Sequence, residues 1–166
     1  MTLVDTLKSS ELFGGLEVSH LETVADLCRG SSYRKGETIF NEGDEAKEVY
    51  ILADGRVALE MEVRPLPDRP GIPTAVEVVT EGETLGWSAL VEPYVYTLSA
   101  RCLAPCRVLA INGDMVRGIM ADDLYLGYEL MKRLTKIISL RLSNTRLRLM
   151  SGLGLVLLDK ELKPSK

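Results

Sequence analysis

The sequence has few of the residues that build metal and nucleophilic sites. Its 166 residues include one histidine, His20, and three cysteines. A histidine-based metal cluster is therefore excluded, and a Cys–His or Ser–His catalytic pair would have to use this one imidazole. An odd number of cysteines in a chain of cytosolic type argues against a disulfide framework. No pair of carboxylates stands out either, so we expect neither a metal nor catalytic activity.

Long apolar runs are also missing. The longest uncharged apolar run, Gly152 to Leu158, is far shorter than the roughly 20 residues of a membrane-spanning helix. The first eight residues carry Asp5 and no apolar stretch, which predicts that there is no signal peptide. We therefore expect a cytoplasmic protein that does not contact a membrane.

Basic residues are scarce in the first part of the chain and concentrated later. Residues 1–122 contain 20 acidic and 11 basic residues, whereas residues 123–150 contain two acidic and six basic residues. A basic helix could bind nucleic acid or a phosphate group, or it could pair with acidic residues of its own chain. Charge alone leaves both interpretations open.

The period of the hydrophobic pattern changes along the chain. Residues 3–29 show two short helical patterns separated by Gly14-Gly15, and short β-like runs follow from Ser31 onward. Asp54-Gly55 between two of these runs is a strong hairpin signal. The runs cover Ser32–Lys35, Thr38–Phe40, Glu48–Ala53, Arg56–Val63, Ala75–Thr80, Leu98–Leu103 and Arg107–Ile111. They predict a mainly β fold with flanking helices: a β-roll or jelly roll (double-stranded β-helix) with N-terminal helices.

Two further helices are expected after the strands. Residues 113–122 predict a short helix, and a long helix is expected over about 123–150, where the domain formed by residues 1–150 ends and a tail of residues 151–166 begins. One apolar stripe of the long helix contains Leu124, Tyr128, Met131, Ile138, Leu142 and Leu149, and the other contains Leu130, Leu134 and Ile137. Two stripes allow one helix to pack on its own domain and on a second copy, so we predict a homodimer. A single broad core face is the alternative.

A glycine between two predicted strands introduces the functional argument. Gly86 follows the Glu81-Gly82 turn and precedes the short apolar segment Trp87-Ser88-Ala89. A glycine at the start of a helical turn lets backbone N–H groups converge on an anion. One such glycine is weak evidence without the context of the whole chain.

The order of elements, together with three motifs, resembles the cyclic nucleotide-binding domain. This is the effector domain of the catabolite activator protein and of cyclic nucleotide-gated channels and kinases. The motifs are Ile39–Asp44, Val49–Val57 and the phosphate-binding cassette at residues 82–100. The resemblance covers about residues 7–150 and implies a module that senses a cyclic nucleotide or another small anionic ligand.

The cassette departs from the family pattern at two positions. Members that bind cyclic nucleotide have a glutamate after the cassette glycine, which accepts a hydrogen bond from the ribose 2′-hydroxyl, and Trp87 stands here instead. The family arginine that pairs with the cyclic phosphate is replaced by Thr97, and Leu98 follows where a small polar residue is usual. A threonine hydroxyl does not replace a planar cation with five donors. The resemblance therefore implies that binding of cAMP and cGMP is weak or lost.

Three interpretations of the altered pocket stay open. It binds a different, less anionic ligand against Trp87; Trp87 fills it; or the backbone N–H groups of residues 86–89 still bind a cyclic nucleotide weakly. On the long helix, Arg141 and Thr145 match family positions that contact the purine or the partner helix. The candidate ligand-binding residues are Gly86, Trp87, Ser88, Ala89, Thr97, Leu98, Ser99, Arg141 and Thr145.

The predicted function is that of a stand-alone, dimeric sensor or regulatory module, in which a ligand in the cassette shifts the long helix. The alternative is a dimeric interaction scaffold that binds no ligand and docks on a protein partner through its tail. DNA-binding members of the family need a helix-turn-helix domain after the long helix, and residues 151–166 are too few to form one, so we expect no DNA binding. Metal enzymes with a β-roll need several histidines in the barrel, which this chain lacks.

Overall fold

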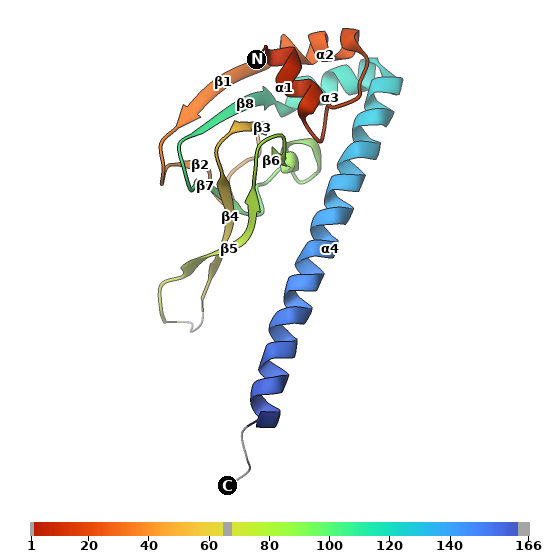
Figure 1. The fold of residues 1–166 in the computed structure, drawn as a ribbon. Coiled ribbons are helices and arrows are strands. Elements are labelled where there is room, and N and C mark those ends of the chain that lie inside the picture. The colour runs from red at the N-terminus through yellow and green to blue at the C-terminus, as the bar shows by residue number, and fades with distance from the viewer. Residues whose placement is uncertain (1, 65–67, 163–166) are drawn as a thin grey trace. The chain divides into compact units, whose positions relative to one another are not determined.

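The computed structural model describes residues 2–64 and 68–162, with side chains as far as Ser151. It divides into two units, Met1–Leu134 and Thr135–Lys166. The first unit contains every strand and the three short α-helices (Figure 1). None of the described helices has an apolar stretch long enough to cross a bilayer.

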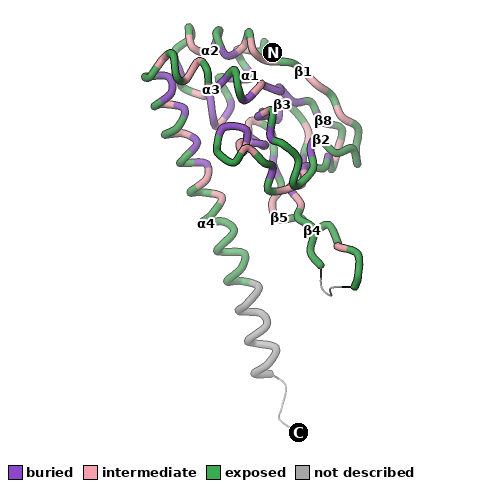
Figure 2. The backbone as a smooth tube through the Cα atoms, turned by 180° about the vertical axis from the view of Figure 1, so that it is seen from behind, coloured by how far each residue is buried: buried purple, intermediate pink, exposed green. Residues whose placement is uncertain are grey.

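Two four-stranded antiparallel sheets form the body of the first unit and confirm the predicted fold class. One sheet has the strand order β1-β8-β3-β6, and the other has the order β2-β7-β4-β5. The strands are β1 Cys28–Tyr33, β2 Thr38–Phe40, β3 Glu48–Asp54, β4 Val57–Val63, β5 Ile72–Val79, β6 Thr84–Leu85, β7 Ser99–Cys102 and β8 Cys106–Asn112. Consecutive buried residues in β3 and β8 form the centre of the core (Figure 2).

Each predicted strand is present, although β5 begins at Ile72 rather than at Ala75, and two larger differences concern β1 and β6. Cys28, predicted to end a helix, begins β1, because the whole strand pairs with β8 from Cys28 opposite Ile111 to Tyr33 opposite Cys106. The prediction also missed β6, a strand of two residues that pairs with β3. Both errors have the same origin, since pairing with a distant strand decides local structure where the local signal is short.

The Asp54-Gly55 pair forms a tight turn between β3 and β4, but the predicted hairpin is wrong, because β3 pairs with β6 and β8 in one sheet and β4 pairs with β5 and β7 in the other. Gly55 has φ of 100°, a conformation that residues with a side chain rarely adopt. A Cβ atom at this position would lie 2.5 Å from the Pro105 carbonyl oxygen and 2.7 Å from the Cys106 Sγ atom. The turn between β3 and β4 therefore packs so closely on the β7–β8 connection that only glycine fits at position 55.

Three short α-helices gather at one end of the sheets (Figure 1). They are α1 Leu3–Ser9, α2 Val18–Ala25 and α3 Gly113–Asp122. The Thr2 side chain accepts a hydrogen bond from the Asp5 N–H group, while the Asp5 carboxylate accepts one from the Thr2 N–H group. This reciprocal capping box fixes the start of α1. The bounds of α3 agree with the predicted helix.

Helix α4, Leu124–Leu162, begins in the first unit and forms the described part of the second. The Asp123 carboxylate accepts a hydrogen bond from the Leu126 N–H group at 3.0 Å, so Asp123 caps the helix. The helix ends later than predicted, because its backbone continues beyond Met150 to Leu162. The first part of the expected tail is therefore helical, and residues 163–166 lie outside the described residues.

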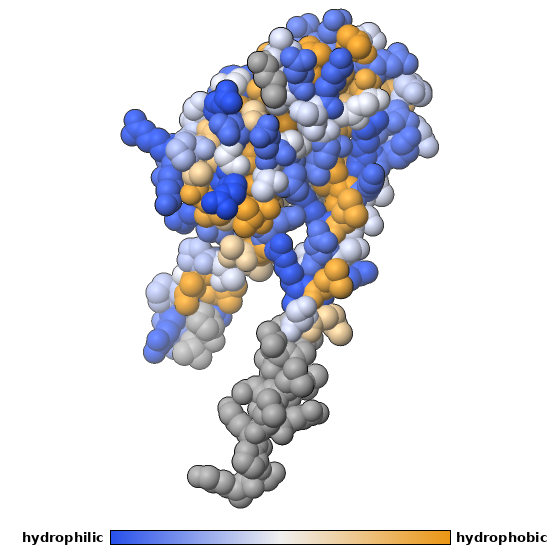
Figure 3. Space-filling model, viewed as in Figure 1, coloured by the Kyte–Doolittle hydropathy of each residue, from blue (hydrophilic) through white to orange (hydrophobic). Residues whose placement is uncertain are grey.

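The two apolar stripes of α4 differ in burial. The residues Leu126, Leu130, Leu134 and Ile137 are buried. The other stripe is mostly exposed: Leu124, Tyr128, Met131, Leu142 and Leu149 range from 42% exposed at Met131 to 79% at Leu124, whereas Ile138 is half-buried. Apolar side chains accordingly appear on the surface along the described part of the helix (Figure 3).

Candidate functional site

The turn at Gly86 links β6 to a short 3₁₀ helix, η1, Trp87–Leu90. Gly86 is left-handed, with φ of 71° and ψ of 21°, and its carbonyl oxygen accepts a hydrogen bond from the Ala89 N–H group at 3.0 Å. A Cβ atom at Gly86 would lie 3.0 Å from the Glu48 carbonyl oxygen and 3.1 Å from the Tyr50 ring. Glycine is thus required here both by the backbone angles and by the close packing.

An aromatic cluster supports the turn from the inside of the roll. The ring centroids of Phe40 and Tyr96 lie 3.9 Å apart, and those of Phe40 and Tyr50 lie 5.6 Å apart. The Tyr96 hydroxyl donates to the Glu48 carbonyl oxygen at 2.7 Å and accepts from the Glu48 N–H group at 3.2 Å. The Tyr50 hydroxyl donates to the Glu48 carboxylate at 3.0 Å. All three rings are buried, so the cluster is a rigid floor beneath Gly86.

Burial raises the pKa values of the Tyr50 and Tyr96 hydroxyls above their ordinary value. Both groups therefore stay protonated at neutral pH and serve as hydrogen-bond donors. The sequence pattern did not identify this cluster, because its three rings come from segments far apart in the chain.

The loop that follows η1 is fixed to the β2–β3 connection by backbone hydrogen bonds. The Tyr96 carbonyl oxygen accepts from the Gly43 N–H group at 2.8 Å, and the Tyr96 N–H group donates to the Asp44 carbonyl oxygen at 2.9 Å. The Tyr94 carbonyl oxygen accepts from the Ala46 N–H group at 2.7 Å. These backbone hydrogen bonds hold the segment between Gly86 and β7 against the β2–β3 connection.

The predicted site residues of this segment differ in exposure. Trp87 and Ser88 are half-buried in η1, and Ala89 is fully buried. Thr97 is exposed and Leu98 is half-buried, immediately before β7. The short turn therefore brings Gly86, Trp87, Ser88 and Ala89 together. No side-chain hydrogen bond or ion pair is found for Thr97 within the part of the chain that the structure describes.

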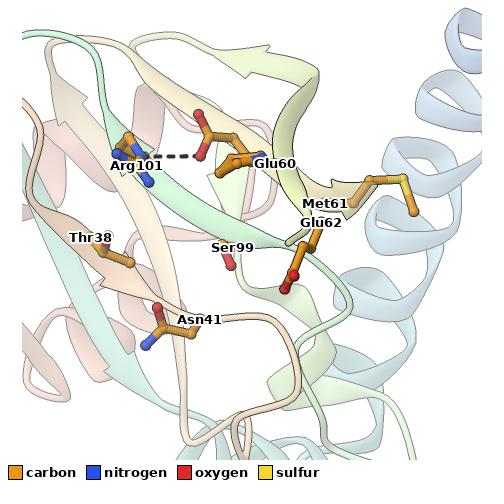
Figure 4. Close-up of a pocket in the computed structure, with 9 residues that line it drawn as sticks. Thr38, Asn41, Glu60, Met61, Glu62, Ser99 and Arg101 are labelled. Atoms are coloured by element: carbon orange, nitrogen blue, oxygen red, sulfur yellow. Dashed lines mark hydrogen bonds and ion pairs between the residues drawn. The ribbon is translucent and has the colours of Figure 1, made fainter. Parts of the chain in front are cut away.

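Ser99 lies elsewhere, in a hollow on the exposed face of the second sheet (Figure 4). Its hydroxyl accepts a hydrogen bond from the Glu42 N–H group at 2.9 Å. Ser99 and Arg101 share this face of β7, whereas Ala100 and Cys102 between and after them are buried. Gly86 and Trp87 do not line this hollow.

The hollow is small, and its arginine is already paired with a carboxylate. It has a volume of about 140 Å³, and the Arg101 guanidinium pairs with the Glu60 carboxylate across it at 3.1 Å. It is lined by Thr38, Asn41, Glu60, Met61, Glu62, Gly71, Pro73, Ser99 and Arg101. Because its cation already has a carboxylate partner, the hollow is a poor substitute for a phosphate site.

Arg141 and Thr145 belong to the second unit and lie on one face of α4. The Thr145 hydroxyl donates to the Arg141 carbonyl oxygen at 2.9 Å, a contact within the helix. Thr145 is exposed and Arg141 is half-buried. Their contribution to a ligand site remains a prediction.

The thiols have no features of a reactive centre. Burial raises the pKa of Cys28 to about 11 and that of Cys102 to about 12, so both are thiols at neutral pH. Among the described residues, no three histidine, cysteine or acidic side chains are placed to hold a metal ion.

A two-sheet roll, with helices at one end and a left-handed glycine opening a short helical turn, defines a class of small-ligand effector domains. The model of the family described as "Cyclic nucleotide-binding domain" matches residues 31–123, and the chain belongs to this family.

Curated relatives and solved structures agree with this assignment. The CRP-like cAMP-activated global transcriptional regulator of Mycobacterium tuberculosis (strain ATCC 25618 / H37Rv) is 23% identical over 141 residues, which cover 85% of this chain and 59% of the regulator. The same regulator of strain CDC 1551 / Oshkosh matches to the same extent. The chain thus spans about three fifths of the length of the curated relatives it matches.

Among solved structures, a candidate cyclic nucleotide-binding protein from Geobacter metallireducens GS-15 is 30% identical, with a TM-score of 0.74, and the match covers 86% of this chain and 99% of that one. The catabolite activator protein of Thermus thermophilus is 22% identical with a TM-score of 0.68, covering 86% of this chain and 63% of that one. The regulatory domain of Toxoplasma gondii PKA, crystallised with cAMP, is 21% identical with a TM-score of 0.60, covering 70% and 42%. At these identities, the Thermus thermophilus and Toxoplasma gondii structures show only that this chain has the same fold.

Proposed function

We propose that the chain is a divergent cyclic nucleotide-binding domain that acts as a small-ligand sensor or regulatory module, with weak or lost affinity for cAMP and cGMP. The observation that supports this most directly is the Gly86 turn. It keeps the left-handed glycine on a rigid aromatic floor, while Trp87 and Thr97 occupy the positions that hold ribose and phosphate in the family.

The missing polar groups account for the loss of affinity. A hydrogen bond to a charged group contributes about 1.5–3 kcal/mol, and an arginine paired with a phosphate contributes two such bonds at once. The Thr97 hydroxyl carries no charge and lies on the exposed surface. Trp87 adds an indole at the ribose position, where a carboxylate would accept a hydrogen bond.

The sensor is distinguished from a scaffold by calorimetric titration and thermal shift with cAMP, cGMP and a panel of small metabolites. A rise in melting temperature with one ligand, lost in Gly86→Val, supports the sensor. If no ligand changes the melting temperature and acrylamide does not quench Trp87 fluorescence, the sensor is ruled out and the interaction scaffold is favoured. For either outcome, we propose a protein without catalytic activity that resides in the cytoplasm.

We also propose that the exposed stripe of α4 forms a homodimer. Its apolar residues fit a register of alternating steps of four and three positions, which also passes through Thr135 and Thr145, as in the seam of a coiled coil. All of these apolar residues except Ile138 are exposed in a single chain. We predict that Tyr128→Glu/Leu142→Glu weakens dimerisation at least about a hundredfold, because each glutamate would place a charge in an apolar seam.

Sedimentation equilibrium provides the test of the dimer. Ser143→Glu/Asn144→Glu is the matched control, because it adds the same charge at exposed positions of α4 outside the seam. We expect wild type and control to be dimers at micromolar concentration. A monomeric wild type, or a control that dissociates as readily as the seam variant, would be inconsistent with this interface.

A further inference from the structure

Arg117 of α3 joins the Gly86 turn to the helices that follow it. One guanidinium nitrogen, Nη1, donates to the Ala89 carbonyl oxygen in η1. The guanidinium carbon lies 4.1 Å from the centroid of the Tyr94 ring, within the range of a cation–π contact. The other nitrogen, Nη2, pairs with Asp114 on the same helix. One side chain therefore contacts both η1 and the loop after it.

The backbone of α3 also approaches η1 at a distance that only glycine permits. A Cβ atom on Gly113, the first residue of α3, would lie 2.7 Å from the Ala89 oxygen and 2.9 Å from the Ala89 Cβ atom. The Gly113 N–H group donates to the Lys47 carbonyl oxygen at 2.8 Å. At Gly113 the backbone of α3 is therefore in direct contact with Ala89 of η1.

The other end of α3 is joined as closely to the start of α4. A Cβ atom on Gly127 would lie 2.6 Å from the Met120 carbonyl oxygen. Asp123 closes α3 through its N–H bond to the Ile119 carbonyl oxygen, 2.9 Å, and caps α4 through its carboxylate. Helix α3 is therefore in tight contact with η1 at one end and with the first turn of α4 at the other.

We propose that Arg117 is the positioning residue that makes η1, α3 and the first turn of α4 move as one body. A displacement of Ala89 pulls on the guanidinium, and α3 carries the displacement to Asp123. This inference deepens the proposed sensor function by naming the side chain that transmits occupancy of the Gly86 turn. It requires no ligand to be tested, because the coupling is present in the free protein.

Trp87, the only tryptophan of the chain, lies within η1 and reports directly on this coupling. Arg117→Met keeps the length of the side chain and removes the guanidinium. We expect acrylamide quenching of Trp87 fluorescence to rise about twofold, and amide hydrogen exchange in residues 86–91 and 124–128 to rise at least about threefold. Arg117→Lys keeps a cation but loses the planar fork, so it should restore part of both effects.

Arg107→Met is the matched control, since Arg107 is an exposed arginine of the first unit whose ion pair with Asp54 lies on β8 and β3. We expect it to leave quenching and exchange unchanged. The proposal is overturned if Arg117→Met changes neither readout, or if exchange rises equally in β1, which would indicate general destabilisation. Because no ligand is added, these results stand apart from a failure of the proposed sensor function.

Discussion

Trp87→Glu/Thr97→Arg should bind cAMP at least about a hundredfold more tightly than the wild-type protein. The Gly86 turn already has the left-handed geometry and the aromatic floor, so the substitutions add polar groups to a formed scaffold. Glu at 87 would accept from the ribose hydroxyl, and Arg at 97 would supply a bidentate donor for the phosphate. Isothermal titration calorimetry at fixed ionic strength measures the gain.

Trp87→Ala/Thr97→Ser is the control for this experiment, because it removes the indole without supplying a carboxylate or a cation. We expect this variant to gain less than about tenfold. An equal gain in both variants would mean that the bulk of the indole, and not the lost polar contacts, limits affinity. No gain in the Glu/Arg variant would mean that the turn is not a nucleotide cassette in function.

Gly55→Ala should be among the most destabilising single substitutions in the chain. A methyl group at Gly55 would be forced against the Pro105 oxygen and the Cys106 sulfur, and overpacking of this kind costs about 1–3 kcal/mol. The positive φ adds about 1–2 kcal/mol for a residue with a side chain. We expect the free energy of unfolding, measured by urea denaturation, to fall by about 2–5 kcal/mol.

Gly43→Ala separates the two contributions. Gly43 has φ of 87°, and a Cβ atom there would have no neighbour within 4 Å. We expect it to lose only the conformational part, about 1–2 kcal/mol. The structure places the β7–β8 connection in close contact with the turn between β3 and β4. Equal losses in the two variants would contradict this contact.

The sequence predicts the fold where the pattern is local and repeated. The tight turn at Asp54-Gly55 follows from a short-range rule and is present, whereas the hairpin expected around it is not, because β3 and β4 belong to different sheets. Cys28 was assigned to a helix because nothing nearby shows that β8 lies beside it. Strand prediction is most accurate where the residues of the strand, rather than a distant partner strand, determine its conformation.

The candidate site was predicted only along the segment that carries the family motif. Gly86 and the residues after it lie together as expected, because they are consecutive in the chain. Ser99 shares one face of β7 with Arg101 and lines a hollow that neither Gly86 nor Trp87 lines (Figure 4). Arg117 contacts η1 from 28 positions away, and no spacing rule connects such residues before the fold is known.

Titration of the wild-type protein with cAMP tests the central claim most directly. If Trp87 and Thr97 have removed the ribose and phosphate contacts, calorimetry should give a dissociation constant weaker than about 100 µM, or no measurable heat. A dissociation constant of about 1 µM or tighter, lost in Gly86→Val, would contradict the account, because the turn would then bind cyclic nucleotide without the side chains held to be essential.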